Sequence, residues 1–224
     1  MLIFSPFALL FVFFLFLFLI VLFVIVHVGI IAIAAEKLGL SVNQIFLFLM
    51  ASLLGSHINL PLARVPRPPD PLEETLVRFF GIPYAVPPRV AERHTVVALN
   101  VGGGLIPTLL SLYLWFKHGF LLAPLLGVIL VSWICYHLAR PVPGVGIAVP
   151  FLIPPIVAAL YALLVVPQKA PAVAYISGTL GTLIGADLLH LRDLPRLRAP
   201  VASIGGAGTF DGIFLTGIVA VLLA

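Results

Sequence analysis

Asp187 and Asp211 are the residues of this sequence best placed to do chemistry, because each stands in a stretch otherwise apolar enough to cross a membrane. A carboxylate at the centre of a membrane helix costs at least ~2.5–3.5 kcal/mol, so such residues usually have a function. Glycine-rich segments at 181–185 and 205–208 adjoin them, and glycine permits breaks and close backbone approach. The pattern predicts an intramembrane polar site that exchanges protons or binds a cation.

Other polar residues fall at a similar depth in the predicted helices. Asp187 lies roughly 6 Å, and Asp211 roughly 13 Å, from the cytoplasmic helix ends at ~1.5 Å per residue. His57, Asn59 and Asn100 stand near the ends of neighbouring helices, so we expect all five to face one pocket. The candidate residues for binding a substrate or ion are Asp187, Asp211, Asn100, His57, Asn59, Gly102, Gly103, Ser203, Gly205, Gly206 and Thr209.

A metal site is a variant of this prediction. His57, Asp187, His190 and Asp211 are side chains of the types that zinc or manganese accepts. Asp187 and His190 also share one face of a helix at spacing i, i+3. The spacing identifies no particular metal, and no cofactor is indicated. The one cysteine, Cys135, excludes an internal disulfide.

The composition indicates a multi-pass, all-α membrane protein. Hydrophobic residues make up 62% of the chain and charged residues 9%, against about 25% charged in soluble domains. The apolar residues gather in runs near the ~20 that a spanning helix needs. The net charge of +4 does not indicate nucleic-acid binding, because the basic residues stand between apolar runs.

Seven helices are predicted within a single polytopic membrane domain, residues 1–224. The fifth contains three prolines, so we expect it to be kinked or broken near its start. The predicted helices cover residues 8–35, 41–63, 96–117, 120–139, 146–166, 171–191 and 202–224.

The distribution of basic residues predicts the orientation. Nine arginines fall in loops on the side of the N-terminus, and the three lysines fall on the other side. The positive-inside rule therefore places the N-terminus in the cytoplasm and the C-terminus outside a prokaryotic cytoplasmic (inner) membrane. The Pro-rich segment 64–95 becomes a cytoplasmic loop, in which 72–80 could form a short interfacial helix.

An internal parallel repeat is also predicted. Residues 54–60 align with 184–190, and residues 100–104 align with 203–207, so helices two and three echo helices six and seven. Glycine- or proline-interrupted segments at corresponding positions of two halves point to a transporter's binding site. The alternative is that glycines such as those of 181–185 serve close helix packing.

The same segments resemble an uncharacterised prokaryotic membrane protein family, domain of unknown function family 1614. The resemblance rests on residues 55–62, 100–107, 139–147, 185–187 and 203–214, and it extends over most of the chain after the first helix. The family implies no activity, substrate or cofactor, so function depends on the site.

Three functions fit these residues. The first is a small transporter or ion-coupled permease in which Asp187 and Asp211 exchange protons or bind a cation. The second is an intramembrane aspartyl protease with Asp187 and Asp211 as the catalytic pair. Its topology resembles that of presenilin-like enzymes, but two residues separate Gly208 from Asp211 where those enzymes have Gly-x-Gly directly before the aspartate.

The third function is a non-catalytic subunit or assembly factor whose aspartates pair with arginines. For all three functions the predicted partners are the lipid bilayer and a small solute, an ion or a membrane-embedded peptide. The sequence does not decide whether the protein forms oligomers. Replacing either aspartate by asparagine distinguishes the three functions, because only the protease should lose cleavage and only the transporter should lose proton coupling.

Overall fold

A computed structural model describes residues 14–18, 29–30, 32–66, 76–79, 82–85, 94–119, 122–142, 146–197, 199–206 and 212–224. The chain divides into two compact units, Met1–Leu47 and Phe48–Ala224. In the first unit, residues 14–18, 29–30 and 32–37 are helical, as predicted for 8–35 where it is described. Helix α2 (Val42–Gly55) begins after a capping box in which Ser41 and Gln44 bond each other's backbone amides.

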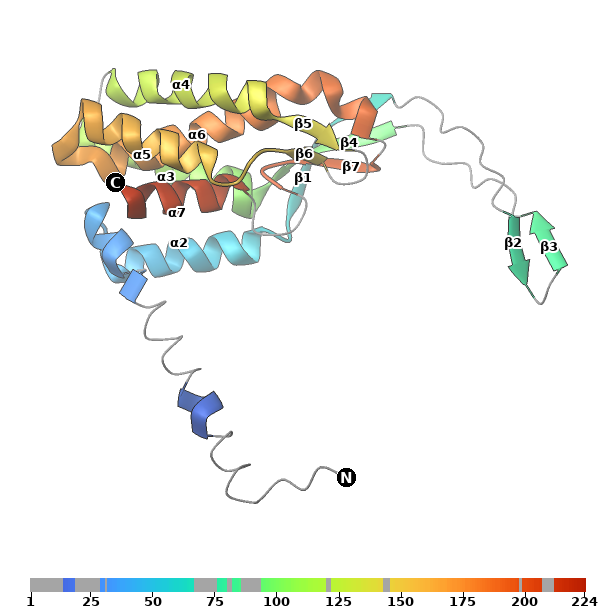
Figure 1. Cartoon of the computed structure of the whole chain (residues 1–224), viewed down its shortest axis with the longest axis horizontal. Helices are drawn as coiled ribbons and strands as arrows, with labels where there is room; N and C mark the ends of the chain where they lie inside the picture. The colour runs from blue at the N-terminus through green and yellow to red at the C-terminus, as the bar shows by residue number, and fades with distance from the viewer. Residues whose placement is uncertain are drawn as a thin grey trace. The chain divides into compact units, whose positions relative to one another are not determined.

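The second unit is built around helix α6 (Ala170–Thr182). It contacts α3 (Ile106–His118), α4 (Ala123–Leu138), α5 (Ile153–Val165) and α7 (Gly212–Leu223), which lie side by side with it (Figure 1). Every residue of α6 except Pro171 is buried. Proline stands in the first turn of α3, α4, α5 and α6, where its missing N–H has no partner to lose.

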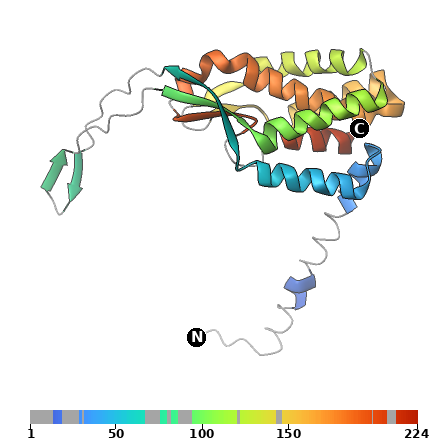
Figure 2. The same ribbon diagram turned by 180° about the vertical axis from the view of Figure 1, so that it is seen from behind.

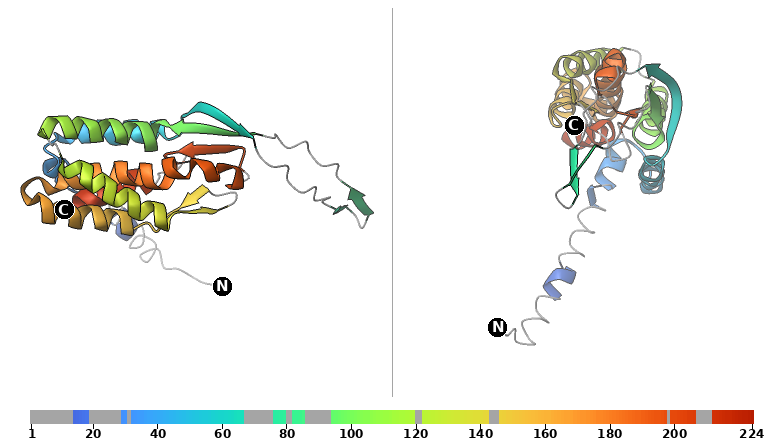
Figure 3. Two further views of the ribbon diagram at one scale, coloured as in Figure 1. Left: turned by 90° about the horizontal axis from the view of Figure 1, so that it is seen from above. Right: turned by 90° about the vertical axis from the view of Figure 1, so that its right-hand side faces the viewer.

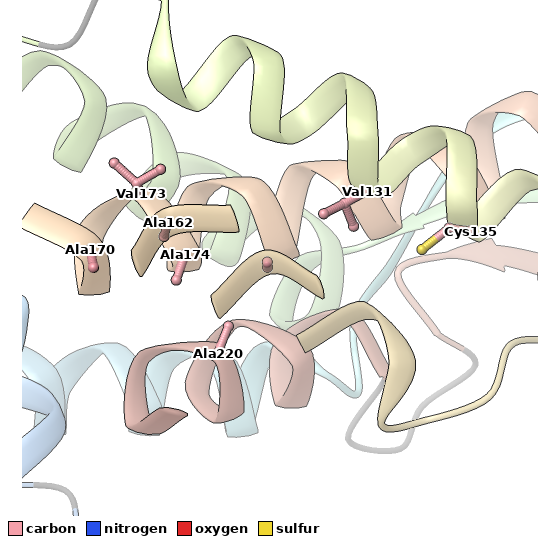
Figure 4. Packing of buried hydrophobic residues seen from close by; sticks show 8 residues of the cluster. Val131, Cys135, Ala162, Ala170, Val173, Ala174 and Ala220 are labelled. Carbon is pink, nitrogen blue, oxygen red and sulfur yellow. The ribbon is translucent and has the colours of Figure 1, made fainter. Parts of the chain in front are cut away.

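Small residues allow α4 and α6 to pack closely. A Cβ added to Gly181 would lie 2.6 Å from Cβ of Val131, and one added to Gly185 would lie 2.4 Å from the carbonyl oxygen of Ser132. The packing role proposed for these two glycines is therefore confirmed. An apolar cluster fills the rest of the bundle, as Figure 4 shows, with Val131, Cys135, Ala162, Ala170, Val173, Ala174 and Ala220.

A three-stranded sheet lies at one end of these helices. Strand β1 (Asn59–Pro66) pairs antiparallel with β4 (His94–Asn100), and β4 pairs parallel with β7 (Val201–Ile204) in the order β1-β4-β7 (Figure 2). The register of β4 and β7 runs from Val96 opposite Val201 to Leu99 opposite Ile204. Figure 3 shows β4 running directly into the α3 segment. Two further antiparallel pairs are described: β2 (Leu76–Phe79) with β3 (Ile82–Ala85), and β5 (Arg140–Val142) with β6 (Gly146–Ala148).

These strands correct the predicted all-α class and several helix boundaries. Residues predicted as the end of helix 41–63, the start of 96–117 and the start of 202–224 form β1, β4 and β7. Part of the predicted interfacial helix 72–80 is strand β2. The physical reason is that a short apolar run has the same hydropathy in a strand as in a helix. The break expected near the start of 146–166 is confirmed, since β6 precedes α5.

The described chain is mostly helical. One helix within the described residues, Pro167–Leu194, is long and apolar enough to cross a membrane by length and composition. Other apolar helices, such as α4 with 16 residues, are shorter than the ~20 residues that span a bilayer. The seven spans, their orientation and the internal repeat stay predictions.

Candidate functional site

Two π-helical turns mark the junction between the sheet and the helices. The first, η1 (Val101–Leu105), joins β4 to α3, and the second, η3 (Leu183–Asp187), follows α6. A π-turn adds one residue to a helical turn and so rotates the residues after it by roughly 100° around the axis. Such turns occur often at functional sites. Both contain residues predicted to form the site, Gly102 and Gly103 in the first and Asp187 in the second.

Asn100 holds the first π-turn in place from its buried position at the end of β4. Its Oδ1 accepts a hydrogen bond of 2.7 Å from the Gly103 amide, which caps the turn. Its Nδ2 donates to the carbonyl oxygen of Ser56 at 2.7 Å and to Oδ1 of Asn59 at 3.1 Å. The side chain therefore uses both ends to join the turn after α2, β1 and η1.

Asn59 extends this network across the sheet. Its Oδ1 accepts from Asn100 and also from the hydroxyl of Ser203 on β7. Asn59, Asn100 and Ser203, which stand in three different strands, thus share one hydrogen-bonded group. The prediction that these residues line one pocket for a solute or ion stays a prediction.

Gly102 brings the end of α2 against the first π-turn. A Cβ added to Gly102 would lie 1.9 Å from the Ser52 carbonyl oxygen and 2.3 Å from the Ser56 nitrogen. The Ser52 hydroxyl donates to the Gly102 carbonyl. Sequence reasoning missed Ser52, in the last turn of α2, and Ser56, in the turn directly after it.

Asp187 connects the second π-turn to the glycine turn after β7. Its Oδ2 accepts a hydrogen bond of 2.7 Å from the Gly205 amide, and the residue is half-buried. Gly205 has a φ of 82°, and a Cβ added there would lie 2.4 Å from the Gly104 nitrogen. The Gly205 backbone therefore stands between the Asp187 carboxylate and the first π-turn.

The two candidate histidines, His57 and His190, differ in burial. The His57 side chain is exposed, and its Nδ1 is 3.4 Å from the Ser56 hydroxyl. His190 is buried, with Nδ1 3.1 Å from the Gly185 carbonyl oxygen and its ring against Tyr136. Among the described residues, no three His, Cys, Asp or Glu side chains form a group that could hold a metal ion.

The predicted partner of Asp187 lies outside the described residues. Asp211 and Thr209 belong to the segment 207–211, so an Asp187–Asp211 pair stays a prediction. Gly206, the last residue described before this segment, has a φ of 100°. The chain therefore leaves β7 through two consecutive glycines with positive φ, a backbone conformation that residues other than glycine rarely adopt.

The chain belongs to the family described as "Protein of unknown function (DUF1614)", whose model matches residues 53–223. This match contains β1, both π-turns, Asn100, Asp187 and Gly205. A comparison with the curated proteins and with the solved structures finds no match.

Replacing Asn100 by alanine is expected to destabilise the protein by about 2–4 kcal/mol, because it leaves the buried Ser56 carbonyl and Gly103 amide without this partner. Thermal unfolding in detergent measures the change. Thr108→Val is the control, since it removes a single hydroxyl bond to the Gly104 carbonyl in the next turn. If the two substitutions destabilise the protein equally, Asn100 contributes no more to its stability than a single hydroxyl bond, which contradicts the role described here.

Proposed function

We propose that the chain is a small permease of the prokaryotic cytoplasmic membrane, in which Asp187 couples solute movement to protons or a cation. The observation that carries this proposal is the hydrogen bond between the Asp187 carboxylate and the Gly205 amide, made where a π-turn meets a glycine turn. Broken helices whose backbone groups face a substrate or an ion recur in transporter binding sites.

The hydrogen bond gives a physical route to coupling. An ionised carboxylate accepts a charge-assisted hydrogen bond, which is roughly twice as strong as a neutral one. Protonation of Asp187, or a cation on its oxygens, therefore weakens its hold on the Gly205 amide. Because the Gly205 backbone also packs on Gly104, release of this contact changes how the turn after β7 sits on the first π-turn.

The apolar surface of the helices supports a lipid environment. Phe116 on α3 is 81% exposed and Leu164 on α5 is 82% exposed, and exposed apolar side chains recur along α4. Extensive exposed apolar surface marks membrane or protein interaction sites. The charge distribution favours a cytoplasmic N-terminus. Together these features favour a multi-pass protein whose polar junction lies toward the cytoplasm.

Proton flux into proteoliposomes tests the proposal. An imposed pH gradient should drive flux through the wild-type protein, and Asp187→Asn should lower it by about tenfold or more, as expected for a lost proton-transfer group. Asp193→Asn is the matched control, because it removes a carboxylate from the 3-10 helix η4 (Leu188–Leu197) that follows the site. Equal flux through wild type and Asp187→Asn would refute the role of Asp187.

The same variants distinguish the two other functions. An aspartyl protease would be indicated if the wild-type protein cleaved a peptide but carried no proton flux, and if Asp187→Asn and Asp211→Asn each abolished that cleavage. A non-catalytic membrane subunit would be indicated by two results together. The wild-type protein would carry no more proton flux than empty liposomes, and Asp187→Asn would change only the stability of the protein.

A further inference from the structure

Two neighbouring hydroxyl groups on α6 make no hydrogen bond of ordinary geometry. Tyr175 and Thr179 stand one turn apart on α6, and both are wholly buried. Neither Tyr175 Oη nor Thr179 Oγ1 makes a hydrogen bond of ordinary geometry to a described residue, although the two hydroxyls lie close enough to interact with each other. Buried polar groups are nearly always bonded to protein or to ordered water, so this pair requires an explanation.

The neighbours of the pair come from α2 and α7. The Phe48 ring is edge-on to Tyr175 with 6.4 Å between centroids, and Phe214 stacks on Phe48 at 5.8 Å. Gly217 on α7 lies against both residues, because a Cβ added there would be 2.5 Å from Thr179 Oγ1 and 2.8 Å from Tyr175 Cε2. These contacts are made by aromatic rings and by a glycine without a side chain, so none of these three side chains offers a conventional polar partner.

Ser177 shows that the rest of α6 follows the usual rule. Its hydroxyl, equally buried, donates to the Val173 carbonyl oxygen at 2.6 Å. Thr179 has no corresponding bond. The two unpartnered hydroxyls therefore form a local exception and not a general property of the helix.

We propose that Tyr175 and Thr179 bind a water molecule between them and form a second polar position inside the bundle. A water molecule can accept from one hydroxyl and donate to the other, which satisfies both groups. Thr179 lies eight residues from Asp187 on the same continuous helix, roughly 12 Å along its axis. The hydrated pair is thus the next proton-carrying position beyond Asp187, a role that rests on the proposed permease function.

Thermal unfolding in detergent tests the bound water independently of transport. Tyr175→Phe and Thr179→Val keep the side-chain shape and remove one hydroxyl each. With a bridging water, each variant melts below the wild type, because a satisfied group is lost and the water is left with fewer partners. If the pair is dry, each variant melts at or above the wild-type temperature, because an unpaired buried hydroxyl is removed, and this result overturns the proposal.

Proton flux in proteoliposomes tests whether protons pass through the hydrated Tyr175–Thr179 pair. Tyr175→Phe should lower flux by about tenfold, the size expected from one lost hydrogen-bonding step, while Ser177→Ala should leave it unchanged. If Asp187→Asn loses flux while Tyr175→Phe keeps it, the bound water is purely structural, and the proposed role of this pair in carrying protons is refuted. Absence of wild-type flux would refute the permease itself, and the melting temperatures would then decide the water site alone.

Discussion

Gly102→Ala is expected to lower the free energy of unfolding by about 3 kcal/mol or more, the upper end of the range for overpacking. The added methyl carbon would lie 1.9 Å from the Ser52 carbonyl oxygen and 2.3 Å from the Ser56 nitrogen. Both are backbone atoms, one in the last turn of α2 and one directly after it, so no change of rotamer relieves the collision. The end of α2 must move away from the first π-turn, and the Ser52 bond to the Gly102 carbonyl is lost with it.

Denaturant or thermal unfolding of the detergent-solubilised protein measures this effect. Gly212→Ala is the matched control, because nothing lies within 4 Å of the added methyl group at the start of α7. Alanine is the better helix former, so the control should be neutral or slightly stabilised. A Gly102→Ala protein as stable as the Gly212→Ala protein would show that α2 and the π-turn do not meet as described.

Gly205→Ala is expected to cost about 2–5 kcal/mol, from backbone strain of order 1–3 kcal/mol together with a packing collision of similar size. Gly205 has a φ of 82°, which an alanine rarely adopts. Its added Cβ would also lie 2.4 Å and 2.5 Å from the nitrogen and Cα of Gly104. The donor to Asp187 remains in the variant, so its altered position should also lower proton flux.

Gly146→Ala separates the two causes. Gly146 also has a positive φ, 127°, but nothing lies within 4 Å of its added Cβ. This variant should show the strain without the collision and should keep wild-type flux. Equal destabilisation of Gly146→Ala and Gly205→Ala would mean that the Gly205 turn does not press on the first π-turn.

The polar residues of the site could be predicted from the sequence because each is unusual in its surroundings. Asn59, Asn100 and Ser203 interrupt apolar runs, and a buried polar side chain needs a partner. In the structure Asn59 is hydrogen-bonded to both Asn100 and Ser203, while their predicted role in binding a solute or ion stays a prediction. The glycines at 102 and 205 were informative for a different reason. At both positions two backbone segments approach too closely for a side chain to fit between them.

The local structure around these residues could not be predicted in the same way. The runs before Asn100 and Gly205 are short, and each forms a strand whose pairing partner is distant in sequence. Hydropathy measures apolar character and contains no information about such pairing. The π-turns depend on one inserted residue per turn, which leaves no period in the sequence, so the direction of Asp187 toward Gly205 had to come from the structure.

Infrared difference spectroscopy of the protein in lipid nanodiscs tests most directly whether Asp187 is a proton-exchanging group. A carboxylic acid carbonyl band should appear on acidification of the wild-type protein, be missing from Asp187→Asn, and titrate together with the proton flux. If Asp187 instead stays ionised throughout the pH range in which flux changes, its bond to Gly205 is a structural anchor, and the proposed coupling is contradicted.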